Sequence, residues 1–368
     1  MAFQDVVTPR FYINYLEWIL NNYKTGTPKL VYADLDGNET EEENIELIKY
    51  TGLSNRSALR IKPPLNTHKV YVKFPIEDNS LNTSNPIFQK INFAHFLGHN
   101  FETAAPSAGI ACFVGTVSGD DDNNNTLVLN SLDEHSNVGL SGYLHSSYDG
   151  YSILGTSGLG AGENEVIKEI HLLFRILGSP NTWNGDSSFE FSNFGFGGYF
   201  DMMHSPELDL TYSKSYDGVQ KQKSMGGATL VNYNYLRPPA FGNVGYFELS
   251  NADNPLNVPT RTGRRNYQLN FKYLENSTTK DSLFPQSENL YTIDNGLTQN
   301  DALYDDNSFY GNVIHMTQGG TIPFIFQADN SNFSGDMFSV CTFDQKDFNF
   351  KQVAPSVYDC SLKIVESW

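Results

Sequence analysis

The sequence has few charged residues, and basic residues are the scarcer kind. Charged residues make up 18% of the 368 residues, and 24 Lys and Arg stand against 42 Asp and Glu, for a net charge of −18. Proteins that bind nucleic acid need clustered Lys and Arg, because binding releases counterions from the phosphates. No basic stripe is present, so the composition excludes nucleic acid as the main partner.

Cysteine is scarce as well. The only three are Cys112, Cys341 and Cys360. Three thiols cannot build a disulfide framework or a tetrahedral zinc site, and each lies in an apolar run. We therefore expect buried, unreactive side chains and no cofactor, and we leave open whether Cys341 and Cys360 lie close together.

Long apolar runs are absent too. No segment reaches the roughly 18 apolar residues of a membrane helix, so membrane insertion is not expected. Residues 1–5 lack the basic and apolar regions of a signal peptide. We expect a protein that is made and assembled in a cytoplasm.

The apolar content is carried by aromatic residues. The chain has 21 Tyr, 26 Phe and 30 Gly, together with much Asn, Ser and Thr, which is typical of an all-β protein with many turns. Residues 266–273 and 358–364 alternate polar and apolar side chains, as strands with one buried face do. In the closing strand the predicted inward set is even-numbered: Tyr358, Cys360, Leu362, Ile364 and Trp368.

One helix is predicted near the start of the chain. Thr8 offers an N-cap and Pro9 suits the first helical position. Apolar side chains then follow at spacings of three and four: Phe11, Tyr12, Tyr15, Leu16, Ile19, Leu20 and Tyr23. A short helix is marginal in water and must dock, either on its own chain or on a neighbouring subunit. This makes Phe11 and Tyr15 candidate interface residues.

The rest of the chain divides into two predicted β domains. Residues 1–27 form the helix and its lead-in, 28–185 a first β domain and 186–368 a second, which suits a chain of this length. The predicted strands of the first domain are 69–74, 91–97, 110–114 and 126–129. The longer apolar run at 167–176 could be a strand or a helix, and its β-rich surroundings favour a strand. Alternating Phe and Gly at 194–198 predicts a strand that another backbone approaches closely.

Candidate catalytic and metal-binding patterns are weak. The acidic segments 34–39 and 120–122 lack the spacing of a calcium loop, and we interpret them as solvated turns. The glycine-rich stretch 155–162 lacks the Lys and Ser or Thr of a phosphate loop. Asp201, His204 and Ser205 are near in sequence but have no nucleophile elbow, so a simple turn is favoured. We therefore predict that the protein is not an enzyme.

A series of short segments is more informative than any single motif. In order, the segments are 8–12, 96–100, 148–150, 198–210, 216–219, 226–228, 263–265, 319–327 and the closing strand to Trp368. The series resembles virion structural proteins of tailed bacteriophages, especially those of marine phages, over nearly the whole chain. The resemblance implies two β-sandwich or jelly-roll-like domains: a jelly-roll or galactose-binding-like domain at 28–185 and a tail-type β domain at 186–368. It also implies ring-like self-association and contacts with other virion proteins, and no catalytic residues.

Arg264 and Arg265 form a cationic pair in this acidic chain. One hypothesis is that they make charge-assisted bonds across a subunit or domain boundary, and the alternative is an ordinary strand flank. Two other functions stay open. The 28–185 domain could recognise host surface glycans as an adhesin, or the chain could be a polysaccharide depolymerase with two carboxylates at a fixed separation.

Overall fold

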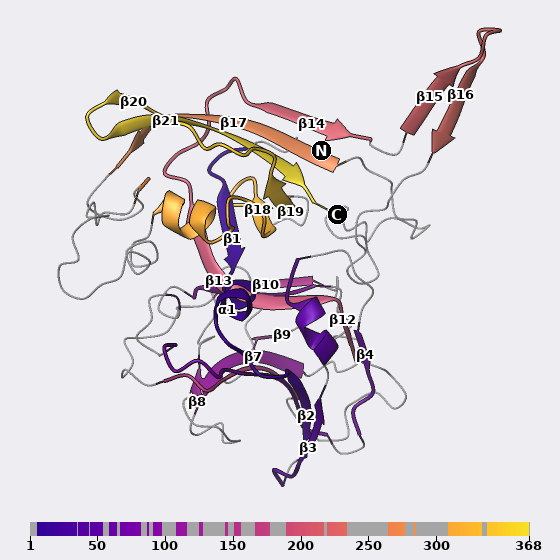
Figure 1. Ribbon diagram of the computed structural model, residues 1–368, viewed down its shortest axis with the longest axis vertical. Helices are drawn as coiled ribbons and strands as arrows, with labels where there is room; N and C mark the ends of the chain where they lie inside the picture. Colours follow the sequence, from indigo (N-terminus) through magenta and orange to yellow (C-terminus); the bar gives the residue numbers. More distant parts are fainter. Residues whose placement is uncertain are drawn as a thin grey trace.

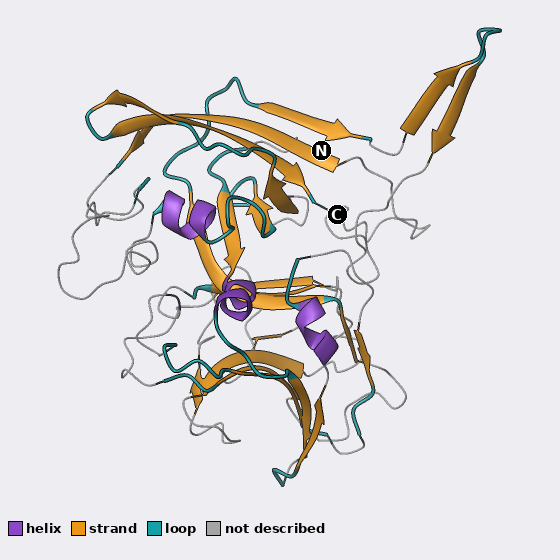
Figure 2. Ribbon diagram, viewed as in Figure 1, coloured by secondary structure: helices purple, strands orange, loops and turns teal. Residues whose placement is uncertain are grey.

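The computed structural model describes residues 6–34, 36–43, 45–53, 59–64, 67–81, 87, 91–97, 108–115, 125–127, 144–145, 151–155, 166–176, 189–216, 219–233, 264–276, 283–284, 308–332 and 337–367. These residues form antiparallel β-sheets with a few short helices (Figures 1 and 2). The predicted all-β class with a short N-terminal helix is confirmed. Several predicted features lie outside the described residues: 98–100, 120–122, 148–150, 156–162 and Trp368.

The larger sheet has ten strands and draws on the whole chain. Its order is β10 (Tyr151–Gly155), β6 (Phe93–Leu97), β13 (Asn193–Asp201), β1 (Arg10–Asn14), β18 (Phe324–Gln327), β19 (Phe338–Phe343), β21 (Val357–Glu366), β17 (Arg264–Glu275) and β14 (Thr211–Ser215), with β20 (Phe350–Ala354) paired to β21. Strands from all three predicted segments therefore share one sheet. The sheet does not follow the predicted boundaries after residues 27 and 185.

A second sheet has seven strands. Its order is β3 (Glu39–Glu43), β2 (Lys29–Ala33), β5 (Lys69–Pro75), β11 (Glu169–Ile176), β7 (Ala108–Gly115) and β8 (Asn125–Leu127), with β9 (Leu144–His145) paired to β7. The strands predicted at 69–74, 110–114 and 167–176 are confirmed here. Two small sheets complete the set: β4 (Leu59–Ile61) with β12 (Phe189–Phe191), and β15 (Val219–Lys223) with β16 (Thr229–Tyr233).

The end of the ten-stranded sheet that contains β10, β6 and β13 packs face to face against the seven-stranded sheet (Figure 1), and the buried apolar residues form one connected core. Phe74 of β5 contacts Phe194 of β13, with their ring centroids 6.0 Å apart. In Figure 1 the strands β10 and β13 lie above β7 and β2, and the ten-stranded sheet continues upward to β17 and β21. The result is a sandwich in the lower half of the view, joined through β13 and β1 to the upper half.

The N-terminal helix is shorter than predicted and begins later. Residues 10–14 form β1, which pairs with both β13 and β18, and only then does α1 (Tyr15–Asn22) begin. Asn14 is its N-cap and accepts a hydrogen bond from the Glu17 N–H. The prediction of an N-cap at Thr8 is wrong, because strand pairing on both sides of residues 10–12 satisfies their backbone groups better than one helical turn would.

The glycines of β13 open one face of the strand to the start of α1. A Cβ on Gly197 would lie 1.8 Å from the Ile13 carbonyl oxygen, and one on Gly195 would lie 2.7 Å from Asn14 Oδ1. Phe194, on the opposite face of the strand, packs against Phe74 of the second sheet. The predicted close backbone approach at 194–198 is thus confirmed.

The closing strand has the predicted parity. Cys360, Leu362 and Ile364 are buried, and residues 361 and 363 between them are exposed. Leu362 pairs with Leu269 of β17, so the two alternating segments seen in the sequence are neighbours. The described connections between strands include the 3-10 helix η1 (Ile45–Tyr50), the π-helix η3 (Tyr310–His315) and a turn at Gly319–Gly320.

Candidate functional site

Two of the four predicted interface residues lie inside the chain. Phe11 has none of its surface exposed, and Tyr15 has 2%. Phe11 packs against Phe309, Phe324 and Phe326, with centroid distances of 5.3 to 5.8 Å. Both aromatic side chains are therefore buried in the core of one chain, and neither is exposed for contact with a neighbouring subunit.

The third, Arg265, forms a buried ion pair within the ten-stranded sheet. Its backbone N–H donates to Glu366 Oε2 at 2.8 Å, and its Nη2 donates to Glu366 Oε1 at 3.3 Å and to the Phe338 carbonyl at 2.6 Å. Arg265 is 4% exposed and Glu366 6%. The predicted charge-assisted bonds are present, but they join the neighbouring strands β17, β21 and β19. Arg264, the fourth residue, is half-buried at the start of β17.

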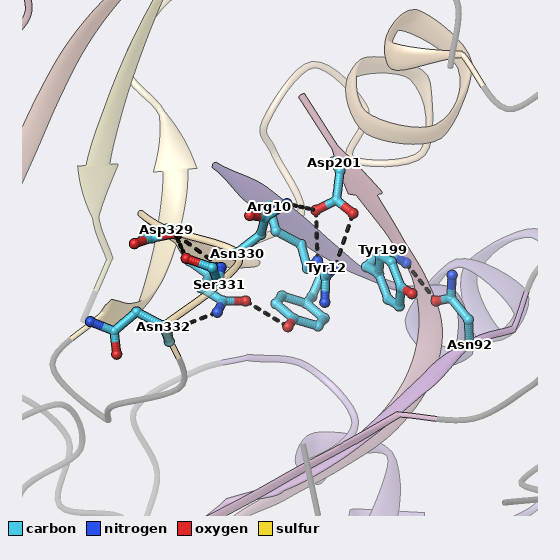
Figure 3. A network of polar contacts seen from close by, with 10 residues as sticks. Arg10, Tyr12, Asn92, Tyr199, Asp201, Asp329, Asn330, Ser331 and Asn332 are labelled. Carbon is cyan, nitrogen blue, oxygen red and sulfur yellow. Dashed lines mark hydrogen bonds and ion pairs between the residues drawn. The ribbon is translucent and has the colours of Figure 1, made fainter. Parts of the chain in front are cut away.

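A polar network fixes β1 between its two neighbours (Figure 3). The Arg10 guanidinium donates to both oxygens of Asp201, at 2.7 and 3.0 Å, and lies over the Tyr199 ring at 4.0 Å. Asn330 also donates to Asp201, at 3.1 Å. These bonds hold β1, β13 and the loop after β18 together, and bidentate pairing makes their geometry specific.

The same network argues against a catalytic triad of Asp201, His204 and Ser205. The Asp201 carboxylate is engaged by Arg10, and His204 Nδ1 contacts the Ser205 carbonyl oxygen at 2.8 Å. His204 therefore contacts the backbone of Ser205, not its hydroxyl group. The predicted turn is the better description of this segment.

The remaining sequence candidates are also engaged locally. The Asp34 side chain accepts hydrogen bonds from Asp36 N, Asn38 N and Asn38 Nδ2, all within its own turn, which lowers its pKa. In the part of the chain that the structure describes, no group of three or more His, Cys, Asp or Glu could hold a metal ion. Cys341 and Cys360 are buried and free, and burial raises the pKa of each thiol to about 12. They are therefore not reactive nucleophiles.

A buried cluster that the sequence did not indicate lies beneath α1. Asn14 Nδ2 donates to the Thr51 carbonyl at 2.6 Å, and Asn193 Nδ2 donates to the next carbonyl, that of Gly52. Asn193 Oδ1 then accepts from His95 Nε2 at 2.7 Å. Two asparagines on adjacent strands thus hold the turn after η1 against the sheet.

Burial sets the protonation of this cluster. His95 has none of its surface exposed, and desolvation lowers its pKa to about 4. Nearby, Glu17 faces Gly52, and its Oε2 is buried without a hydrogen-bond partner among the described residues. Desolvation raises the pKa of Glu17 to about 7. Both side chains favour their neutral forms, which indicates a structural cluster.

We expect Glu17→Gln to stabilise the protein at alkaline pH. The folded state holds the Glu17 proton up to about pH 7, whereas the unfolded chain releases it near its ordinary pKa of 4.5. Wild-type stability is therefore lost as pH rises through this window, by at most about 3 kcal/mol. Urea unfolding at pH 4, 6 and 8 should show a difference between variant and wild type that grows with pH.

The contribution of His95 has the opposite sign, since stability is lost as pH falls from 6.5 toward 4. The His95 contribution is present in both the wild type and the Glu17→Gln variant, so it cancels in the difference between their free energies of unfolding. Glu275→Gln, at an exposed position of β17, is the control and should change the free energy of unfolding by less than about 0.5 kcal/mol. A pH-independent gain for Glu17→Gln would contradict the expectation.

The hairpin β15–β16 is the most exposed element that the structure describes. In Figure 1 it projects from the body beside β14. Gln220, Lys221, Gln222 and Lys223 are exposed on β15, and Leu230 and Val231 of β16 are 60% and 39% exposed. Because Lys221 pairs with Val231 and Gln222 with Leu230, both faces of the hairpin are open.

The tip of this hairpin is a tight turn. Gly227 has φ +82°, and its N–H donates to the Ser224 carbonyl at 2.9 Å. Glycine suits this conformation because a side chain would be strained there. The turn leaves Met225 fully exposed. We refer to residues 219–233 as the arm.

Two further observations bear on function. None of the described helices has the length and apolar content needed to cross a membrane. Comparison of the chain with protein-family models, with curated proteins and with solved structures finds no match. Function is therefore inferred from the sequence and the geometry of this chain.

Proposed function

We propose that the chain is a structural component of a tailed-phage virion, associated with the tail or baseplate, that self-assembles and contacts other virion proteins. The ordered series of segments from residue 8 to the closing strand supports the proposal, as does the exposed arm. The finer fold assignment, a jelly-roll or galactose-binding-like part followed by a tail-type part, belongs to the same proposal. Catalysis, nucleic-acid binding and membrane insertion form no part of it.

The arm is the observation that carries the proposal. A two-stranded hairpin alone is at best marginally stable in water, because it buries little apolar surface. The arm presents Met225, Leu230 and Val231 to solvent. An element of this kind gains most of its order from a partner that covers it, as in assemblies built from projecting β-hairpins.

Charge favours association with acidic surfaces. Residues 219–233 contain Lys221 and Lys223 and no acidic residue, although the whole chain has a net charge of −18. A basic arm on an acidic body steers copies into head-to-tail contact, since like surfaces repel and unlike surfaces attract. Head-to-tail contacts between identical subunits close into rings when the rotation allows it.

Removing the apolar side chains of the arm is expected to weaken self-association about tenfold or more. The test variant combines Met225→Ser, Leu230→Thr and Val231→Thr, which keep the hairpin length and its strand propensity. Light scattering during size-exclusion chromatography would give the oligomer mass over a concentration series. Negative-stain electron microscopy would show whether rings form.

Val353→Thr is the matched control, because Val353 is 41% exposed on β20, away from the arm. It should assemble as the wild type does. A wild-type protein that stays monomeric at high concentration and forms no ring would overturn self-assembly. Rings that persist in the triple variant would show that the arm is not the contact.

A further inference from the structure

A polar groove lies on the outer face of β17 and β21. These two strands lie side by side along the top of the molecule in Figure 1. The groove has a volume of about 600 Å³ and is bordered by Asp209 on one side and by residues 344–347 and Asn349 on the other. This volume is within the range of about 300–1,000 Å³ that small-ligand sites occupy.

Strand alternation places polar side chains along the floor. Gln268 and Lys272 of β17 are exposed, as are Ser361 and Lys363 of β21, whereas the apolar residues between them point into the core. Gln268 is paired in register with Lys363. The floor thus carries hydrogen-bonding groups in fixed rows about one strand spacing apart.

Hydrogen bonds fasten both walls to this floor. Gln345 Oε1 accepts from the Lys363 N–H at 2.8 Å, and Asp344 N–H donates to the Lys363 carbonyl at 2.9 Å. On the other side, Glu207 N–H donates to the Asn270 carbonyl at 2.7 Å. Since both walls are tied to the same two strands, the shape of the groove exists before any ligand binds, which lowers the entropy lost on binding.

The groove is locally neutral in an acidic protein. Its acidic lining residues are Asp209, Asp344, Asp347 and Asp359. Its basic lining residues are Lys272, Lys346, Lys351 and Lys363. Among the described residues, none of these lysines forms an ion pair with a carboxylate. Donors and acceptors of both kinds are therefore available to a ligand.

This chemistry selects a neutral ligand that is rich in hydroxyl groups. The four aspartates would repel a polyanion, and the four lysines would repel a polycation. The attraction of either ligand to the groups of opposite charge would not offset this repulsion. A hydroxyl group, in contrast, can donate to a carboxylate and accept from an ammonium or amide group at once. We propose that the groove binds a neutral oligosaccharide, a function separate from self-assembly through the arm.

An array of neutral, sialylated, sulfated and uronic acid-containing glycans, probed with the full chain, tests the proposal. We expect retention on neutral glycans, followed by calorimetric titration of the best one. Asp347→Ala, Lys351→Ala and Gln268→Ala should each weaken its binding about tenfold, because each removes a hydrogen bond that involves a charged or fixed polar group. Thermal unfolding would verify that each variant is folded.

Gln352→Ala is the matched control. Gln352 is exposed on β20 next to Lys351 but does not line the groove, so binding should be unchanged. Absence of binding to every glycan, binding to charged glycans alone, or binding that survives all three groove variants would each overturn the proposal. The groove variants leave the arm intact. Measuring their oligomer mass therefore distinguishes a failure of glycan binding from a failure of self-assembly.

Discussion

Gly197→Ala is expected to prevent the chain from folding. The new methyl group would lie 1.8 Å from the Ile13 carbonyl oxygen and 2.8 Å from the Tyr15 N. Neither atom can move away, because Ile13 belongs to β1, which pairs with β13 on one side and with β18 on the other, and Tyr15 is the first residue of α1. Relief would need β1 and β13 to separate, and with them the junction between the two halves of the molecule.

The measurement is soluble yield together with thermal unfolding by circular dichroism. Gly226→Ala is the control, because a Cβ there meets only Ser224 Oγ, at 4.0 Å. It should fold, with a change of less than about 1 kcal/mol. A Gly197→Ala protein that is soluble and melts within a few degrees of the wild type would refute the close packing of β13 on the start of α1.

Arg265→Met is expected to destabilise the fold by about 3–5 kcal/mol. The substitution leaves the Glu366 carboxylate buried without its counter-charge, and it removes the donor to the Phe338 carbonyl. A buried charge without a partner has no access to water that would replace the lost bonds. Equilibrium unfolding in urea at neutral pH would give the free-energy difference.

A double variant distinguishes loss of the pair from loss of packing. Arg265→Met combined with Glu366→Leu removes both charges, and much of the stability should return, since apolar replacement of a buried pair is often neutral. Lys29→Met is the surface control: its partner Glu41 is partly exposed, so the change should stay within about 1 kcal/mol. Equal effects for Arg265→Met and Lys29→Met would contradict the buried pair.

The arm and the groove are independent features of the surface. The arm projects beyond β14, whereas the groove lies on β17 and β21 and the loop that follows β19. One offers apolar side chains with two lysines, and the other offers a neutral, polar lining. Variants of one should not change the behaviour of the other, and the two proposals can therefore fail separately.

The sequence by itself determined the strands whose side chains alternate. The even-numbered inward face of 358–364, the strand at 69–74 and the close approach at 194–198 follow from local pattern. Alternation of polar and apolar residues indicates which face of a strand is buried, whatever the position of that strand in the sheet. These features could be predicted because they depend on neighbours in the chain.

Only the tertiary structure decided which segments pair. Residues 10–14 have the spacing of a helix, yet they form a strand because β13 and β18 lie on either side of them. Arg265 and Glu366 are 101 positions apart, and Arg10 and Asp201 are 191 apart. No local pattern encodes such pairings, so the place of each cation, the exposure of the arm and the walls of the groove come from long-range packing, which overrides local propensity.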